Sequence, residues 1–164
     1  MKFNFPIAVN MHEFLKTGRF DYIEIGQSDE QILQMFPDPD CTSQGLIVKQ
    51  GLNIWLYGNI EFHFSDGILN QIRLEHLPFG SLDGGRSILL HPSLFGQPEK
   101  LNLNFVLNQL IRHHIDFFKI EDAANVILRL QSGVDLVFEK DGQQRLNTVC
   151  KRKAALPQWL LEAV

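Results

Sequence analysis

The clearest periodic pattern of hydrophobic positions lies between residues 102 and 114. Apolar side chains recur there at intervals of three and four residues, which is the spacing that places them on one side of an α-helix. The positions are Leu103, Val106, Leu107, Leu110, Ile111 and His114. Asn102 is the predicted N-cap, because its side chain can accept a hydrogen bond from a free amide of the first turn. The pattern predicts an amphipathic helix with His114 as a hydrogen-bonded core or interface histidine.

Two shorter helices are predicted near the start of the chain from their capping signals. Asn10 begins a capping-box sequence, and Gly18 is the expected left-handed stop of that helix. The segment Ser28–Gln31 is a second capping box with two acidic residues in its first turn, where the helix dipole favours them. Pro37 and Pro39 are expected to end this second helix, because proline donates no amide and disfavours helical geometry in the residue before it.

Short segments with strand-like patterns occupy most of the remaining chain. The expected strands are 20–25, 46–49, 53–57, 59–64, 68–75, 126–130, 134–139 and 145–150, with 87–90 and 116–120 as further candidates. The sequences Ser65-Asp66-Gly67 and Asp141-Gly142 predict hairpin turns, because aspartate and glycine tolerate the backbone angles that such turns need.

This order of elements predicts an α+β fold, with helices packed on an antiparallel β-sheet and with two α/β half-repeats as one arrangement of it. We assign residues 1–77 to a first half and 102–153 to a second half, within one compact domain of 164 residues. Residues 78–101 form a linker or long loop, and residues 154–164 form a C-terminal tail.

Composition and charge narrow the classes of function. The formal net charge of -4 disfavours a protein that binds nucleic acid by neutralising phosphates. The chain has no long apolar segment and no recognisable signal peptide, so we expect a cytoplasmic protein with no membrane partner. Its cysteines, Cys41 and Cys150, fit two reduced structural residues, with a disulfide as the alternative.

No set of residues strongly predicts catalysis, a metal or a cofactor. Glu61 and His63 alternate on one strand face and could act as a general base with its orienting carboxylate, or could simply form a solvated face. The loop Gly84–Ser87 has a composition seen in phosphate loops but lacks their Gly-Lys-Ser/Thr ending. The other histidines have no metal-ligand spacing. We therefore expect neither an enzyme nor a cofactor-binding protein.

An acidic segment between residues 21 and 40 contains no lysine or arginine. Its carboxylates are Asp21, Glu24, Asp29, Glu30, Asp38 and Asp40. They could serve only to solvate the surface and complement the helix dipole, or they could form a binding surface that steers a basic protein partner.

Residues 25–75 carry a pattern that consists of Ile25-Gly26-x-Ser28-x-x-x-Ile32, a proline, Trp55-x-Tyr57-Gly58, Glu61-Phe62-x-Phe64, Asp66-Gly67 and Ile72. The pattern resembles the helix-pair-plus-sheet unit of small outer-membrane-assembly lipoproteins and of β-lactamase-inhibitor protein. It is also similar to small cytoplasmic bacterial proteins that are candidate toxin-immunity factors. The resemblance implies a protein-binding scaffold without chemistry of its own. The chain lacks the lipoproteins' signal peptide and lipid-bearing cysteine, so we expect no envelope role.

Three hypotheses about function follow. The first is a non-catalytic cytoplasmic bacterial protein that binds another protein, for example as an immunity factor against a toxin domain. The second is a small-molecule binding or enzymatic domain with a pocket between the two halves, with Glu61, His63 and the loop Gly84–Ser87 at its mouth. The third is self-association into a homodimer through exposed strand edges or the C-terminal tail, which contains Trp159.

The acidic segment gives a first testable prediction. Because Asp38 and Asp40 follow the helix-ending Pro37, replacing both with asparagine should leave thermal stability nearly unchanged. If the segment steers a basic partner, the same double substitution should slow association, and the effect should shrink at high salt. Thermal melting and stopped-flow association measure the two effects, and an unchanged association rate at low salt would reduce the segment to a solvated surface.

Overall fold

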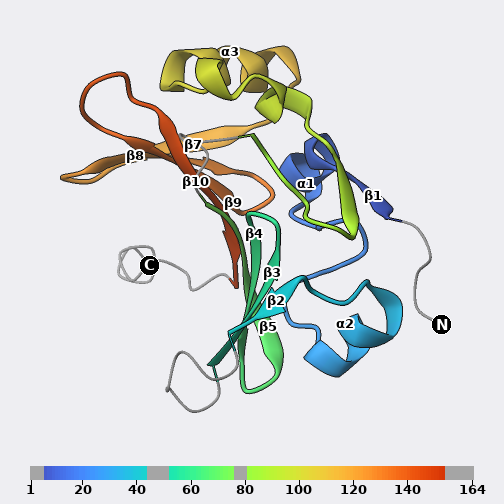
Figure 1. Cartoon of the computed structure of the whole chain (residues 1–164). Coiled ribbons are helices and arrows are strands. Elements are labelled where there is room, and N and C mark those ends of the chain that lie inside the picture. Colours follow the sequence, from blue (N-terminus) through green and yellow to red (C-terminus); the bar gives the residue numbers. More distant parts are fainter. Residues whose placement is uncertain (1–5, 44–51, 76–80, 154–164) are drawn as a thin grey trace.

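The fold is α+β, as the sequence predicts, with three α-helices and a large antiparallel sheet. The computed structural model describes residues 6–43, 52–75 and 81–153. The helices are α1 (Met11–Thr17), α2 (Asp29–Met35) and α3 (Leu103–Arg112), and their buried residues belong to a single hydrophobic core. Figure 1 shows the helices beside the sheet, with α3 over the strands of the second half and α2 beside those of the first.

The main sheet has eight strands in the order β2-β3-β4-β5-β10-β9-β8-β7. Their bounds are Cys41–Thr42 (β2), Leu52–Tyr57 (β3), Ile60–Ser65 (β4), Ile68–Leu74 (β5), Phe117–Glu121 (β7), Asn125–Leu130 (β8), Val134–Glu139 (β9) and Leu146–Arg152 (β10). All neighbours in this sheet are antiparallel. The pairing of β5 with β10 joins the four strands of each half into one continuous sheet.

A small parallel sheet lies apart from the large one. Strand β1 (Ile7–Asn10) pairs with β6 (Ile88–His91), which confirms the candidate strand near residues 87–90. Two 3₁₀ turns, η2 (Ser93–Gly96) and η3 (Pro98–Lys100), follow β6, and the sequence analysis predicted neither. Leu94 and Phe95 of η2 are buried, so this part of the expected linker packs against the core.

The predicted N-cap residues are confirmed at all three helices, although the reciprocal capping box expected at both α1 and α2 forms only at α2. Asn10 accepts hydrogen bonds from His12 N and Glu13 N, and Asn102 accepts one from Phe105 N at 2.9 Å. Ser28 and Gln31 form the reciprocal capping box of α2. Within the described residues, no helix combines the length and apolar character that crossing a bilayer requires.

Aromatic side chains form the centre of the core beneath the first half of the sheet. Phe36 follows α2 and packs its ring against Phe20, Tyr57 and Phe62 at centroid distances of 5.5–6.4 Å. Phe14 of α1 contacts Phe20 edge-on at 5.8 Å. The cluster therefore ties the loop before α2 and both N-terminal helices to strands β3 and β4.

Several strand predictions need correction. Residues 20–25 form no strand: Phe20 and Ile23 pair with each other across a tight turn in which Asp21 has a φ of 57°. The turn lets both Phe20 and Ile23 point into the core. Strand β2 was missed, and the expected strand at 46–49 lies outside the described residues. The Asp141-Gly142 signal falls within a longer connection that spans residues 140–145.

The prediction for the end of α3 is also wrong. The helix ends at Arg112, with His113 as its C-cap, and His114 has a left-handed φ of 54°. His114 is consequently exposed rather than buried, and Ile111 is 64% exposed. Ile115 enters the core in their place because the chain reverses at His114 and turns back toward β7.

The aromatic core generates a prediction about stability. Phe36→Ala should lower the free energy of unfolding by about 3–5 kcal/mol, because it leaves a cavity among the rings of Phe20, Tyr22, Tyr57 and Phe62. Met35→Ala is the matched control. Met35 precedes Phe36 in the chain, but it is 42% exposed, so its truncation should lower the free energy of unfolding by less than about 1 kcal/mol. Urea denaturation measures both, and similar losses for the two variants would contradict the described core.

Candidate functional site

One face of the large sheet is turned away from the helices. Strand alternation sends one set of side chains into the helix-covered core and the other set to the opposite side, which we call the open face. Its side chains are Cys41, Ile54, Leu56, Glu61, His63, Gln71, Arg73, Glu75, Phe118, Ile120, Asn125, Ile127, Arg129, Asp135, Val137, Glu139, Thr148, Cys150 and Arg152. None of the residues of α1, α2 and α3 that join the core packs on this side.

A single cross-strand row of the open face runs through all eight strands. The register places its members opposite one another in the order Cys41, Leu56, Glu61, Arg73, Cys150, Asp135, Arg129 and Phe118. The middle of the row is charged, and its two ends are apolar. Because β5 and β10 lie at its centre, the row exists only through the junction of the two halves.

Arginine–carboxylate pairs hold the charged part of the row. Arg129 donates two hydrogen bonds to the Asp135 carboxylate, at 2.8 and 2.9 Å, and this contact raises the pKa of Arg129. Arg73 pairs with Glu75, whose carboxylate also accepts a hydrogen bond from Thr148 Oγ1 at 3.5 Å. Both arginines are therefore fixed in position by side chains of the sheet itself.

In each pair the carboxylate lies deeper than the guanidinium. The side chain of Asp135 is 8% exposed against 35% for Arg129, and that of Glu75 is 18% exposed against 39% for Arg73. Arg152, on the same face beside Gln71, is exposed as well. At these two pairs the open face presents guanidinium groups to the solvent and keeps their counter-charges beneath, whereas Glu139, at the end of β9 on the same face, is an exposed carboxylate.

Cys150 lies among these charges and is buried. Burial raises the pKa of its thiol, and the hydrogen bond with Arg152 offsets this rise only in part. A raised pKa leaves the thiol protonated at neutral pH, whereas a nucleophilic cysteine needs the thiolate. Cys150 therefore acts as a packing residue of the face, in agreement with the sequence interpretation of a structural cysteine.

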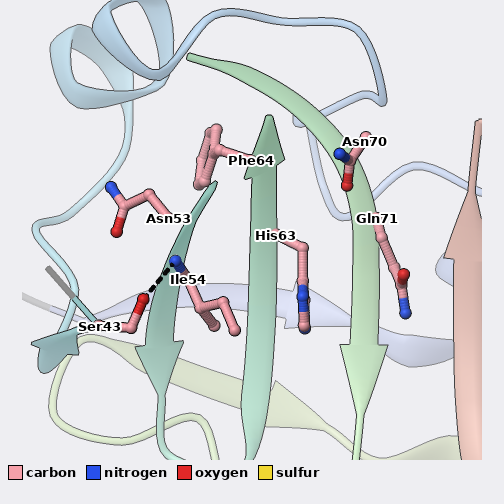
Figure 2. A pocket seen from close by; sticks show the side chains of 7 residues that line it. All are labelled: Ser43, Asn53, Ile54, His63, Phe64, Asn70 and Gln71. Carbon is pink, nitrogen blue, oxygen red and sulfur yellow. Dashed lines mark hydrogen bonds between the residues drawn. The ribbon is translucent and has the colours of Figure 1, made fainter. Parts of the chain in front are cut away.

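The Glu61–His63 pair exists, with Glu61 Oε2 and His63 Nε2 2.7 Å apart. His63 also lines a pocket of about 240 Å³. The other residues of its lining are Ser43, Asn53, Ile54, Phe64, Asn70 and Gln71. Figure 2 shows Ile54, His63 and Gln71 extending from three neighbouring strands, while Ser43 Oγ accepts the Ile54 amide at 2.9 Å.

This pocket differs from the one expected between the two halves. All its lining residues belong to the first half, and none comes from the loop Gly84–Ser87. The Ser43 hydroxyl oxygen accepts a hydrogen bond from the Ile54 amide. Within the part of the chain that the structure describes, no three His, Cys, Asp or Glu residues are close enough to hold a metal ion.

The loop Gly84–Ser87 packs tightly against the side chain of Asp40. Asp40 accepts hydrogen bonds from Gly58 N at 3.0 Å and from Arg86 Nε at 3.1 Å. Gly85 passes so close that a Cβ there would lie 1.7 Å from Asp40 Oδ2. The amide of Gly85 is held by the side chain of Asp83. The loop is thereby fastened to the turn between β3 and β4.

The acidic segment is only partly a free surface. Asp40 makes the contacts with Gly58 and Arg86 just described, which we call the Asp40 clamp, and Glu24 pairs with Arg19 at 2.8 Å. Asp29 accepts the amide of Glu30 at 2.7 Å at the start of α2, while Asp21 is exposed at its tight turn.

Two more acids complete the set. Glu30 is exposed in the first turn of α2, and Asp38 is exposed after Pro37. Tyr57 lies near the end of the segment: burial raises the pKa of its hydroxyl, and the charges of Asp38 and Asp40 raise it further. Of the six carboxylates, Glu24 and Asp40 are thus paired with arginine side chains of this chain, whereas Asp21, Glu30 and Asp38 are exposed.

The sequence had signals for part of the open face. Alternation identified Glu61 and His63, and the two cysteines were noted as structural residues, but Arg73, Arg129 and Asp135 were not singled out. The row that these three share with Cys150 follows from the register between β5 and β10, which joins residues far apart in sequence. No family model, no curated protein and no solved structure matches this chain.

The clamp around Asp40 generates a prediction about glycine. Gly85→Ala should destabilise the fold by at least about 2 kcal/mol more than Gly142→Ala. Both glycines have positive φ angles, 68° and 63°, so both substitutions carry the same backbone strain of about 1–2 kcal/mol. Only Gly85 would also drive a Cβ into Asp40, because nothing lies within 4 Å of Gly142. Equal losses in urea denaturation would refute the close approach.

Asp40 also gives a pH-dependent prediction, which replaces the expectation that its substitution is harmless. Burial raises the pKa of Asp40, but the hydrogen bonds from Arg86 and Gly58 outweigh this and hold the pKa below its usual value. A lowered pKa means that the carboxylate stabilises the fold above its unfolded pKa of about 4 and loses that effect as the pH falls through the folded value.

Asp40→Asn should therefore cost about 1.5 kcal/mol at neutral pH, and the difference from the unsubstituted chain should vanish in acid. Glu30→Gln is the control, with an expected change of a few tenths of a kcal/mol. Denaturation at a series of pH values measures both. A penalty for Asp40→Asn that does not change with pH would contradict the charge-assisted clamp.

Proposed function

We propose that this chain is a non-catalytic bacterial protein that binds another protein through the open face of its sheet. The observation that carries the proposal is that Arg73 and Arg129 are each held above a less exposed carboxylate on a face that α1, α2 and α3 leave uncovered. The partner is a folded protein whose contact surface carries carboxylates among apolar side chains.

The geometry of the arginines supports this choice of partner. A guanidinium held by one carboxylate still has free N–H donors that can engage a second carboxylate in a planar, two-pronged contact. Because Arg73 and Arg129 are already fixed by Glu75 and Asp135, little side-chain freedom is lost when a partner binds. Arginines of this kind are frequent among the residues that dominate binding energy at protein interfaces.

Apolar side chains on both sides of the charged row supply the rest of an interface. Ile120, Ile127 and Val137 form a neighbouring row in register, and Ile54 and Leu56 lie toward the opposite end of the sheet. All five are at least partly accessible to solvent. A core of apolar contacts with arginine among them is the composition typical of protein–protein interfaces.

The acidic segment supports a different partner. Asp21, Glu30 and Asp38 are exposed and would favour a basic surface, as expected from the sequence, and Glu30 lies in α2 rather than on the sheet. An immunity protein that neutralises a toxin domain by covering it could bind through the open face or through the acidic segment. The two surfaces predict partners of opposite charge, so substitution distinguishes them.

The proposal places this binding in the cytoplasm. Cys41 is exposed and Cys150 is buried, and both are free thiols in the structure. An exposed free thiol persists most readily in a reducing compartment, which fits this location.

Charge reversal on the two sides of the sheet tests the proposal. A partner is first recovered from the native host by affinity capture, identified and purified, and its dissociation constant is then measured by calorimetry. Arg152→Glu should weaken binding at least about tenfold, because it replaces a displayed guanidinium with a charge of the wrong sign. Lys16→Glu makes the same change of charge on exposed α1, on the helix-covered side, and should change affinity less than about twofold.

Two results would overturn the assignment. Equal effects of Arg152→Glu and Lys16→Glu would show that only net charge matters. A partner whose binding is weakened by Asp21→Asn and Glu30→Gln but not by Arg152→Glu would place the interface at the acidic segment instead.

A further inference from the structure

Strand β7 forms one outer edge of the large sheet, and the hydrogen bonds at its ends reveal which backbone groups face outward. Asp116 O accepts Gln131 N at 2.9 Å, and Asp122 N donates to Asn125 O at 3.0 Å. In an antiparallel pair, residues bonded to the neighbouring strand alternate with residues whose N–H and C=O point away from it. The even-numbered residues of β7 therefore bond to β8, and Phe117, Lys119 and Glu121 direct their backbone groups to the outside.

Among the residues that the structure describes, no strand pairs with this outer side of β7. We propose that a second copy of this chain does so: β7 pairs with β7 of the partner copy, antiparallel about a two-fold axis perpendicular to the sheet, and the two sheets become continuous. This inference does not rest on the function proposed above, because it is argued from the backbone and charges of the sheet edge, although the pairing would also cover two open-face side chains, Phe118 and Ile120.

Charge fixes the register of this pairing. Lys119 and Glu121 already form an ion pair of 2.7 Å within β7, and both are about half exposed. If residue 119 of one copy lies opposite residue 121 of the other, each lysine meets a glutamate across the axis, and the four side chains alternate in sign. The register shifted by one residue in each copy would instead place Lys119 opposite Lys119, which is destabilising.

The same register brings apolar side chains together on the other side of the strand. Ile120 lies on the two-fold axis opposite its own copy, and Phe118 lies diagonally across from it, within reach of an aromatic side chain. Phe118 is 70% exposed, the highest exposure among the large hydrophobic residues of the described chain. Pairing would cover it and would form about four backbone hydrogen bonds between the two Lys119–Glu121 pairs.

The lysine in this edge makes the pairing selective. A lysine on an edge strand usually blocks random pairing, because an incoming strand would have to bury an uncompensated charge. Lys119 imposes this penalty on other strands, whereas a second copy offers Glu121 at the matching position. The edge is thus protected against general aggregation while it remains complementary to itself.

Charge exchange at the axis tests the register. Sedimentation equilibrium of the full chain at about 100 μM should show a dimer, since this concentration fills an interface of micromolar Kd. Lys119→Glu and Glu121→Lys alone should each raise the dimer Kd about tenfold, because each places two like-charged pairs across the axis. The double variant with both substitutions restores the alternation and should return the Kd to within about twofold of the original.

A proline substitution tests the edge itself. Lys119→Pro removes an outward N–H and no bond to β8, so the fold should persist by circular dichroism while dimerisation is lost. Ile120→Pro is the matched control, because the backbone of residue 120 faces β8 instead of the outside. It removes an N–H bonded to β8 and should lower the unfolding temperature more than Lys119→Pro does. A monomeric full chain at this concentration, or a dimer whose Kd is unchanged by Lys119→Pro, would overturn the proposal.

Discussion

The pairing of β5 with β10 is the contact on which the rest of this structure depends. It places Leu74 beside Val149 and Arg73 beside Cys150, and so joins the four strands of each half edge to edge. Without it, each half would expose one more strand edge, and neither small sheet would bury enough apolar surface alone. One continuous sheet instead lets helices from both halves cover a single face and share one hydrophobic core (Figure 1).

One-sided coverage determines the chemistry of the other face. Side chains there must remain soluble while they stay close to a dense, twisted sheet, and arginine–carboxylate pairs satisfy both conditions. Asp135 and Glu75 lose solvent but gain hydrogen bonds from fixed neighbours, and the guanidinium groups above them stay hydrated. The features that stabilise an uncovered sheet therefore also produce a rigid array of donors, which is why we connect this face with protein binding.

Local features of the fold could be predicted from the sequence, and long-range features could not. The caps at Asn10, Ser28 and Asn102 and the hairpin between β4 and β5 depend on residues close together in the chain, and all are confirmed. Asp40 was misjudged because its partners, Gly58 and Arg86, come from other segments. The charged row was missed for the same reason. The alternation of polar and apolar residues predicts which side chains of a strand share a face. Which residues lie beside them on the neighbouring strands depends on the register of pairing, which the sequence does not show.

The most direct measurement of the central claim is methyl NMR of the isotope-labelled chain with and without its purified partner. If the partner binds the open face, the methyl signals of Ile54, Ile127 and Val137, which lie on that face, should shift or broaden on binding. Methyl groups of the helix-covered side, such as those of Leu33 beside the acidic segment, should change little. Perturbations confined to Leu33 and Ile25, with the open face unaffected, would contradict the claim that the sheet is the binding surface.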